Sequence, residues 1–520
     1  MIKMHNNLLN YLIIIPILSA AFFSFLYLDA KSLWLDEAFS ISFANLSWSD
    51  FWKIIFEEDA NMSLYFVLLK IWVGMFGDSE FVVRSLSAIF AIGGVIMTYA
   101  IGLRLFNIRT GLMAGLVLSV NAFFIRYAQE ARSYTLLLLL ITCSMYLFIR
   151  VIENQQYKYY IALGLTNALV LYTHLFGFFI LIAQAISLVF LPSRTILWKR
   201  MLTSAILTAS LAVPLGVLVL TLKFYPLSWI PKTSLRAVYD LFLHFTGDGG
   251  ELLLLSYLFP CFISFVFSVQ VFIRLKRNQL VWRYALLLCW LFIPILSIYL
   301  VSMFKPAFID RYMFASLPAL VLLAVAGLSS FRFRILSLIA TSLLILLSLH
   351  AVFYVYYPDE KENWRSATGF IVDNAKAGDA ILFSYKPVQI PFEYYYRKMN
   401  HGNDILVSVF PFPFGTPVGV NILSNVLNPS ESMLESVAER YDRLWVVLAY
   451  DGLDSRAIET EYVNLKNVFF EQINIKLYQR FSSVRSIIPS CRQSSNNPNC
   501  RGGSRTAPTG VAIIKPELPL

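Results

Sequence analysis

The sequence predicts a polytopic α-helical membrane protein with a smaller α/β domain after its last membrane span. Of its 520 residues, 58% are hydrophobic and only 14% are charged, whereas soluble globular proteins carry roughly a quarter charged residues. Apolar segments recur between residues 8 and 355, and about 20 apolar residues suffice to cross the hydrocarbon core. Beyond residue 356 the composition becomes that of a soluble domain.

Eleven apolar segments are predicted to span the membrane. The first, residues 8–28, is long enough to cross, and no small-residue cleavage site follows it, so we expect a span rather than a signal peptide. In the polar loop that follows, residues 64–76 form an amphipathic stretch too short to span, expected to lie along the interface. The other spans are expected at residues 81–103, 111–126, 133–151, 159–173, 175–192, 201–222, 252–273, 284–304, 313–331 and 335–355, with the fifth and sixth joined in a tight hairpin at His174.

Charges on alternate connections predict the orientation of these spans. One set of connections holds Lys and Arg residues with the single acid Glu153, and the other set holds acids with fewer cations. Lys and Arg gather in cytoplasmic loops, so the N-terminus is expected in the cytoplasm. The membrane is expected to be the plasma (inner) membrane. An odd number of spans then places the C-terminal part outside, in the periplasm. The net charge of +10 reflects this topology, and we expect no nucleic-acid partner.

The domain boundaries follow from the same change in composition. Residues 1–356 are expected to form the transmembrane domain, with its first outer loop at residues 29–80, and residues 357–480 an outer α/β domain. Residues 481–520 lack a periodic core and are expected to be disordered. Whether Cys491 and Cys500 form a disulfide in this tail stays open.

Within the outer domain, apolar patterns indicate strands and helices. Residues 380–384 and 444–450 are typical of buried strands, and residues 473–477 alternate as in a half-buried strand. Apolar side chains at helical spacing predict one helix around residues 364–371 and another around residues 433–441. A small domain with both element types is therefore expected.

Acidic and basic side chains gather in the connections predicted to lie outside. The spans hold essentially no ionisable residue, whereas ion-coupled transporters and pumps keep such residues near the midplane, where each costs roughly 3 kcal/mol or more. Charged loops on one side would suit an anionic substrate whose tail stays in lipid. The candidates are Asp36, Glu37, Asp59, Arg84, Arg126, Glu130, Arg132, His174, Lys223, Lys232, Arg236, His244, Lys305, Asp310 and Arg311.

Five short motifs follow one another along these loops. They are LWLDEAF at residues 33–39, DANMSLY at 59–65, RSLSA at 84–88, YAQEARSY at 127–134 and KPAFIDRY at 305–312. In order and spacing they resemble the GT-C membrane glycosyltransferases, specifically the bacterial group related to protein O-mannosyltransferases and to the aminoarabinose and Rgt-type lipopolysaccharide glycosyltransferases. Met62 and Ser63 stand where that group usually has two prolines.

The resemblance implies that a sugar is transferred from a polyprenyl-phosphate carrier to an acceptor hydroxyl, with inversion at the anomeric carbon. A phosphate leaves without a general acid, so such an enzyme needs one carboxylate to take the acceptor's proton and cations to hold the phosphate. The implied catalytic acids are Asp36 as the base, with Glu37 and Asp59. The implied phosphate-binding residues are Arg132 and Arg311 first, followed by Arg84, Arg126, Tyr134, Lys305 and Tyr312. The sugar, guessed as mannose or another hexose, and the acceptor, a protein, lipid or glycan, stay open, as does a Mg²⁺ or Mn²⁺ ion at Asp36 and Asp59.

The same residues could instead have purely structural roles. Asp36 and Glu37 could cap a helix, and Asp59 could belong to an acidic patch. The outer-loop cations could anchor span ends, and His174 could be a polar turn residue. Two rival functions are a transporter or flippase of lipid-linked saccharides without chemistry of its own, and a scaffold for envelope assembly. Internal pseudo-repeats would support transport, and the sequence shows none.

Overall fold

A computed structural model gives the structure of the chain. It describes residues 11–57, 60–192, 198–221, 230, 232–331, 333–359, 361–384, 386–399, 406–410, 436–437, 439–449, 462–470 and 472–480. The chain divides into two compact units. The first comprises Met1–Asp29 and Phe43–Asp359, and the second comprises Ala30–Ser42 and Glu360–Leu520.

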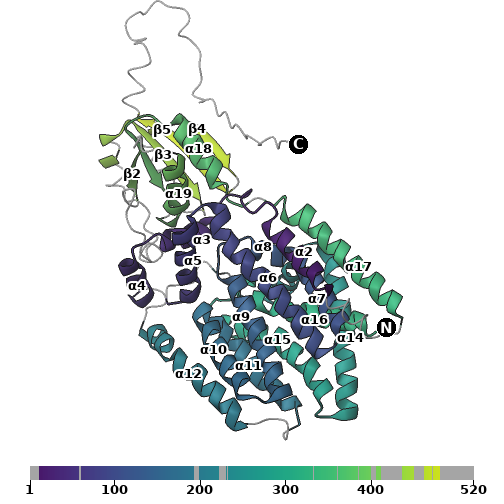
Figure 1. The fold of residues 1–520 in the computed structure, drawn as a ribbon. Coiled ribbons are helices and arrows are strands. Elements are labelled where there is room, and N and C mark those ends of the chain that lie inside the picture. The colour runs from purple at the N-terminus through teal and green to yellow at the C-terminus, as the bar shows by residue number, and fades with distance from the viewer. Residues whose placement is uncertain are drawn as a thin grey trace, which may run out of the picture. The chain divides into compact units, whose positions relative to one another are not determined.

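The first unit is built of helices (Figure 1). Its α-helices are α2 (Ile14–Phe25), α4 (Trp48–Glu57), α5 (Ser63–Phe76), α6 (Glu80–Leu105), α7 (Ile108–Ser119), α8 (Ala122–Ala128), α9 (Tyr134–Asn154), α10 (Tyr157–Thr173), α11 (Phe178–Ser187), α12 (Trp198–Thr221), α13 (Leu235–Thr246), α14 (Gly250–Leu275), α15 (Gln279–Ser302), α16 (Leu317–Ser329) and α17 (Arg334–Ala351). The third predicted span corresponds to α7 and α8 together. Every other predicted span coincides with one of these helices or with a helix and its short 3-10 or π extension, so the predicted helical elements are confirmed.

Helix length gives fewer membrane spans than the eleven that hydropathy predicts. Among the described residues, seven helices are long and apolar enough to cross a membrane, or eight if α7 and α8 count as one bent span. The first, fifth and sixth predicted spans correspond to shorter helices, of which α10 has 17 residues. At 1.5 Å per residue α10 reaches about 26 Å, short of the roughly 30 Å hydrocarbon core. The protein is a multi-span membrane protein, and the count of eleven stays a prediction.

The third predicted span is broken where the second outer loop begins. Helices α7 and α8 meet at an angle of 66°. Asn121 lies at the break, where its Oδ1 accepts from the Phe124 N–H at 2.9 Å and its Nδ2 donates to the Phe245 carbonyl at 2.9 Å. A side-chain oxygen at this position satisfies a backbone donor that the new helix leaves unpaired. The break therefore sets the direction of α8 and of residues 129–133 after it.

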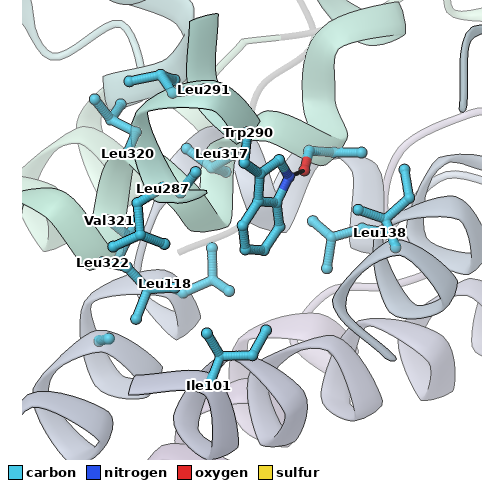
Figure 2. Packing of buried hydrophobic residues seen from close by; sticks show 14 of the residues in the cluster. Ile101, Leu118, Leu138, Leu287, Trp290, Leu291, Leu317, Leu320, Val321 and Leu322 are labelled. Atoms are coloured by element: carbon cyan, nitrogen blue, oxygen red, sulfur yellow. Dashed lines mark hydrogen bonds between the residues drawn. The ribbon is translucent and has the colours of Figure 1, made fainter. Parts of the chain in front are cut away.

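The core of the first unit lies where α6, α7, α9, α15 and α16 pack together. Figure 2 shows Trp290 of α15 at its centre, fully buried, with its Nε1 donating to the Ala315 carbonyl at 2.9 Å. This hydrogen bond satisfies the one polar group of the indole in an apolar surrounding. Several of the labelled neighbours come from the other helices of the group: Ile101, Leu118, Leu138, Leu317, Leu320 and Val321.

Helix α5 corresponds to the predicted amphipathic stretch. It begins after Met62, whose backbone is left-handed (φ 60°), and Lys70 on this helix is buried. The Lys70 ammonium donates to the Ala44 carbonyl at 3.1 Å and also to the Leu46 carbonyl. The helix is confirmed, and its place along the membrane interface stays a prediction.

The second unit contains a five-stranded sheet with the order β2-β1-β3-β5-β4 (Figure 1). Its strands are β1 (Asp379–Phe383), β2 (Leu406–Phe410), β3 (Arg443–Ala449), β4 (Tyr462–Phe470) and β5 (Ile473–Arg480). Strand β1 pairs in parallel with β2 and β3, whereas β5 pairs antiparallel with β3 and β4. The α/β domain also contains helices α18 (Trp364–Asn374) and α19 (Gln389–Met399).

The predicted α/β domain is confirmed, although the sequence showed only part of it. Strands β1, β3 and β5 and helix α18 match the expected elements, while β2, β4 and α19 were not predicted. Of the expected helix at residues 433–441, residues 433–435 and 438 lie outside the described residues, and residues 436–437 and 439–440 are helical. The expected disordered tail, residues 481–520, with Cys491 and Cys500, also lies outside them.

Candidate active site

The acidic pair Asp36 and Glu37 lies in the first turn of helix α3 (Leu35–Ala44). Negative charge is favourable there, because the unpaired N–H groups give a helix N-terminus a partial positive charge. The two side chains differ in exposure: Asp36 is half-buried and Glu37 is fully buried. Glu37 Oε2 accepts a hydrogen bond of 3.4 Å from the Trp34 N–H. Glu37 therefore folds back to cap its own helix, and Asp36 is the more accessible acid.

A third acid, Glu362, supports the start of the same helix. Its Oε2 accepts from the Leu35 N–H at 3.3 Å and from Trp364 Nε1 at 2.6 Å. Burial raises the pKa of Glu362, and the negative charge of Asp36 raises it further. Sequence reasoning missed Glu362. The signal that could have found it is the run of charged residues, 359–362, that directly follows the last predicted span.

Tyr395 of α19 holds the segment that precedes α3. Its hydroxyl accepts from the Leu33 N–H at 2.8 Å and from Ser32 Oγ at 3.1 Å. Ser32 Oγ in turn accepts from the Arg365 N–H at 3.1 Å. From the sequence, residues 29–80 are expected to belong to the transmembrane domain. In the structure Ala30–Ser42 belongs to the second unit, because these hydrogen bonds connect it to α18 and α19.

In the first unit, four of the expected phosphate-binding residues lie around His174. The rings of His174 and Tyr312 are 5.2 Å apart, and Arg311 lies 6.0 Å from the Tyr312 ring. Burial and the charges of Arg132 and Arg311 lower the pKa of His174 to about 3. Arg132 is itself buried and lies 5.9 Å from the Tyr134 ring. The structure thus brings together Arg132, Tyr134, His174, Arg311 and Tyr312, which we call the His174 cluster.

The backbone around Arg132 is held from two sides. The Arg132 carbonyl accepts from Ser87 Oγ at 3.2 Å, and Ser87 Oγ lies 3.2 Å from the Tyr65 hydroxyl. The Arg132 guanidinium also contacts Met62 Sδ at 3.7 Å. Helices α5 and α6 therefore position this arginine, which follows the break between α7 and α8.

The remaining cations have other surroundings. Arg126 forms an ion pair of 2.8 Å with Asp359, and Arg84 is buried and donates to the Leu28 carbonyl at 3.0 Å. Lys305 is exposed just after α15. Through these contacts Arg126 and Arg84 hold the ends of helical segments.

The suggested metal site involves a residue that lies outside the described part of the chain. Asp59 is not among the described residues. Within the residues that are described, no group of three His, Cys, Asp or Glu side chains could hold a metal ion. A divalent cation at Asp36 and Asp59 is thus still an expectation from the sequence.

Comparison with known families adds an observation independent of this geometry. Residues 63–219 match the family of dolichyl-phosphate-mannose-protein mannosyltransferases. The matched segment contains Arg84, Arg126, Arg132, Tyr134 and His174, and it ends before Arg311. No curated protein matches the sequence significantly.

Solved structures show the same fold over nearly the whole chain. ArnT from Cupriavidus metallidurans in the apo state has a TM-score of 0.57 at 13% identity, covering 91% of this chain and 98% of ArnT. The same protein bound to undecaprenyl phosphate gives 0.55 at 13% identity, with 89% and 97% covered. The Archaeoglobus fulgidus oligosaccharyltransferase with Zn and sulfate gives 0.51 at 14% identity, with 84% and 67% covered. With the family match, these similarities confirm the predicted resemblance to GT-C membrane glycosyltransferases and the predicted fold.

Proposed function

We propose that this protein is an integral membrane glycosyltransferase that transfers a sugar from a polyprenyl-phosphate carrier to an acceptor hydroxyl, with inversion. The observation that carries the proposal is the ArnT fold, which covers 91% of this chain and 98% of ArnT. ArnT has been solved with undecaprenyl phosphate, and the family match to residues 63–219 adds the mannosyltransferase class. Both favour transfer over the transport of lipid-linked saccharides.

In the proposed reaction Asp36 is the general base. Its carboxylate takes the proton of the acceptor hydroxyl as the acceptor oxygen forms a bond to the anomeric carbon. The bond between that carbon and the phosphate oxygen breaks, and the phosphate leaves with the electron pair. The half-buried position of Asp36 supports this role, because its carboxylate is more accessible than that of Glu37, which caps α3. Asp59 is a further candidate acid.

Arg132 and Arg311 are the proposed ligands of the departing phosphate. A guanidinium can grip two phosphate oxygens at once and stabilises the charge that develops on them. Their shared place in the His174 cluster supports this assignment. Tyr134 and Tyr312 form the aromatic surroundings of these arginines. Arg84, Arg126 and Lys305 are second choices.

The orientation in the membrane is part of the proposal. The distribution of Lys and Arg over alternate connections supports a cytoplasmic N-terminus in the plasma (inner) membrane and a periplasmic α/β domain. Transfer would then take place at the outer face. The donor sugar is proposed as mannose or another hexose, and the acceptor as a protein, lipid or glycan. A Mg²⁺ or Mn²⁺ requirement is tested by adding EDTA and restoring each ion.

The experiment compares wild type with Asp36→Asn in lipid, using a radiolabelled polyprenyl-phosphate hexose and membrane acceptors. Asparagine keeps the side-chain shape but cannot take the proton, so transfer should fall about 10²- to 10⁴-fold while the donor still binds. Asp50→Asn is the matched control, because Asp50 is an exposed acid of the same loop, bonded to Ser47. Equal transfer by wild type and Asp36→Asn would assign the base to Glu37 or Asp59. No transfer by wild type over a panel of donors would contradict the proposed activity.

A further inference from the structure

His174 carries a buried nitrogen that no residue of the described chain satisfies. It lies between α10 and the 3-10 turn η1 (Leu175–Gly177), and the residue is only 2% exposed. Its Nδ1 accepts a hydrogen bond of 3.2 Å from the Phe176 N–H. Its Nε2 is fully buried and has no hydrogen-bond partner among the described residues. Buried polar atoms are nearly always paired, so this nitrogen calls for an explanation.

The hydrogen bond to Nδ1 determines where the imidazole proton lies. A nitrogen that accepts from a backbone N–H carries no proton, so in the neutral ring the proton is on Nε2. Burial and the two nearby guanidinium charges lower the pKa of His174 to about 3. The ring is therefore neutral at physiological pH, and Nε2 is a buried N–H donor.

The surroundings of this donor select the chemistry of its partner. The charges of Arg132 and Arg311 both act on His174, so a cation would be repelled, and an apolar group would leave the donor unpaired. An oxygen that carries negative charge satisfies the donor and is attracted by both arginines. The rings of Phe176 and Tyr312, 5.3 Å and 5.2 Å from the imidazole, flank it.

We propose that His174 donates from Nε2 to an oxygen of the lipid-linked phosphate monoester that Arg132 and Arg311 bind, as a third ligand in the His174 cluster. This proposal rests on the proposed function and extends it to a residue that neither the family match nor the sequence motifs assign. A neutral donor adds a directional hydrogen bond without adding charge. His174 would thus orient the phosphate, while the two arginines supply most of the attraction.

Two substitutions separate this role from that of a turn residue. In His174→Asn the amide oxygen takes the place of Nδ1 and can still accept from the Phe176 N–H, but the Nε2 donor is lost. In His174→Gln the amide nitrogen reaches the place of Nε2 and keeps a donor there, whereas the acceptor at Nδ1 is lost. A turn residue requires the Asn variant to resemble wild type, and a phosphate ligand requires the Gln variant to do so.

The measurement is binding of a polyprenyl phosphate to the full-length protein in nanodiscs, without an acceptor. His174→Asn should raise the Kd about 10- to 100-fold, as expected for loss of a hydrogen bond to a charged group, with His174→Gln close to wild type. Binding of polyprenol and of inorganic phosphate to the same proteins is measured in parallel. Binding of inorganic phosphate with the same dependence on residue 174 would make free phosphate the ligand, and binding of polyprenol as tight as that of polyprenyl phosphate would overturn the proposal.

Further outcomes separate this inference from the proposed function. If wild type binds polyprenyl phosphate and transfers sugar but His174→Asn binds equally well, or His174→Gln binds no better than His174→Asn, the role of His174 is refuted and the proposed function stands. If wild type does not bind polyprenyl phosphate, both fail. A further test uses NMR of the wild-type protein with ¹⁵N-labelled histidine, so its result does not depend on whether a variant folds. One of its five histidines should show a shifted Nε2–H signal on adding polyprenyl phosphate, and unchanged spectra would contradict the proposal.

Discussion

The backbone N–H of Leu35 donates a hydrogen bond of 3.3 Å to Oε2 of Glu362, a residue 327 positions later in the chain. This contact joins the first turn of α3, which carries Asp36, to a residue two positions before the start of α18. The same carboxylate oxygen accepts from Trp364 Nε1. The position of the proposed catalytic base is therefore specified by the C-terminal α/β domain as well as by the loop in which it lies.

Replacing Glu362 should impair sugar transfer without touching the proposed base. Glu362→Ala leaves the Leu35 and Trp364 donors without their acceptor, at a cost of about 1–3 kcal/mol for each buried donor, and α3 loses the contact that holds its start. We expect about a tenfold loss of transfer, since 1.4 kcal/mol corresponds to a factor of ten. Glu362→Gln keeps an oxygen acceptor and should stay closer to wild type. The exposed acid Glu439 provides a control, Glu439→Ala. Equal activity of the Ala variant and wild type would show that α3 needs no such support.

The stability of the protein should depend on pH through Glu362. Burial, followed by the charge of Asp36, raises its folded-state pKa above the ordinary 4.5. The folded state therefore favours the protonated form, and this contribution is fully present below the unfolded pKa and lost as pH rises through the folded pKa. This contribution is measured as the difference in thermal unfolding between wild type and Glu362→Gln from about pH 4 to pH 8. Wild type should lose stability relative to the Gln variant as pH rises. A constant difference would contradict the raised pKa.

Tyr395 should matter through its hydroxyl group. Tyr395→Phe removes the acceptor for the Leu33 N–H and for Ser32 Oγ, while the ring stays in place. We expect a loss of about 1–3 kcal/mol in local stability, because a buried backbone donor is left unpaired. Hydrogen exchange at residues 32–36 should become faster, with Tyr354→Phe, an exposed tyrosine, as the control. Unchanged exchange in this segment would mean that other contacts hold it.

Close approach of α14 and α16 should make Gly327 intolerant of a side chain. A Cβ atom at Gly327 would overlap the Pro260 carbonyl, and small residues commonly allow such close approach of membrane helices. Gly327→Ala should lower the free energy of unfolding by about 1–3 kcal/mol or more, the usual cost of overpacking. Gly216→Ala is the matched control, since a Cβ there meets no atom within 4 Å. Thermal unfolding in detergent distinguishes them, and equal midpoints would show that the two helices can separate without cost.

Helices and strands whose apolar residues follow a regular short-range spacing could be predicted from the sequence. Apolar segments of nearly span length became helices at the expected places, with the hairpin at His174. Strands β1, β3 and β5 carry the apolar runs or alternation that indicate strands. Strands β2 and β4 were missed, because Leu406–Phe410 and Tyr462–Phe470 include polar residues whose place depends on pairing with β1 and β5.

The sequence by itself determined the class of the protein, the helical segments and the order of its loop motifs, because hydropathy and short-range periodicity depend on neighbouring residues. Tertiary structure alone decided that Glu362 and Tyr395 hold the segment around Asp36, and that the charges of Arg132 and Arg311 act on the neutral ring of His174. These relationships join residues up to 363 positions apart. Hydrogen bonds and burial at such separations arise only when the folded chain brings the groups together, so no local pattern encodes them.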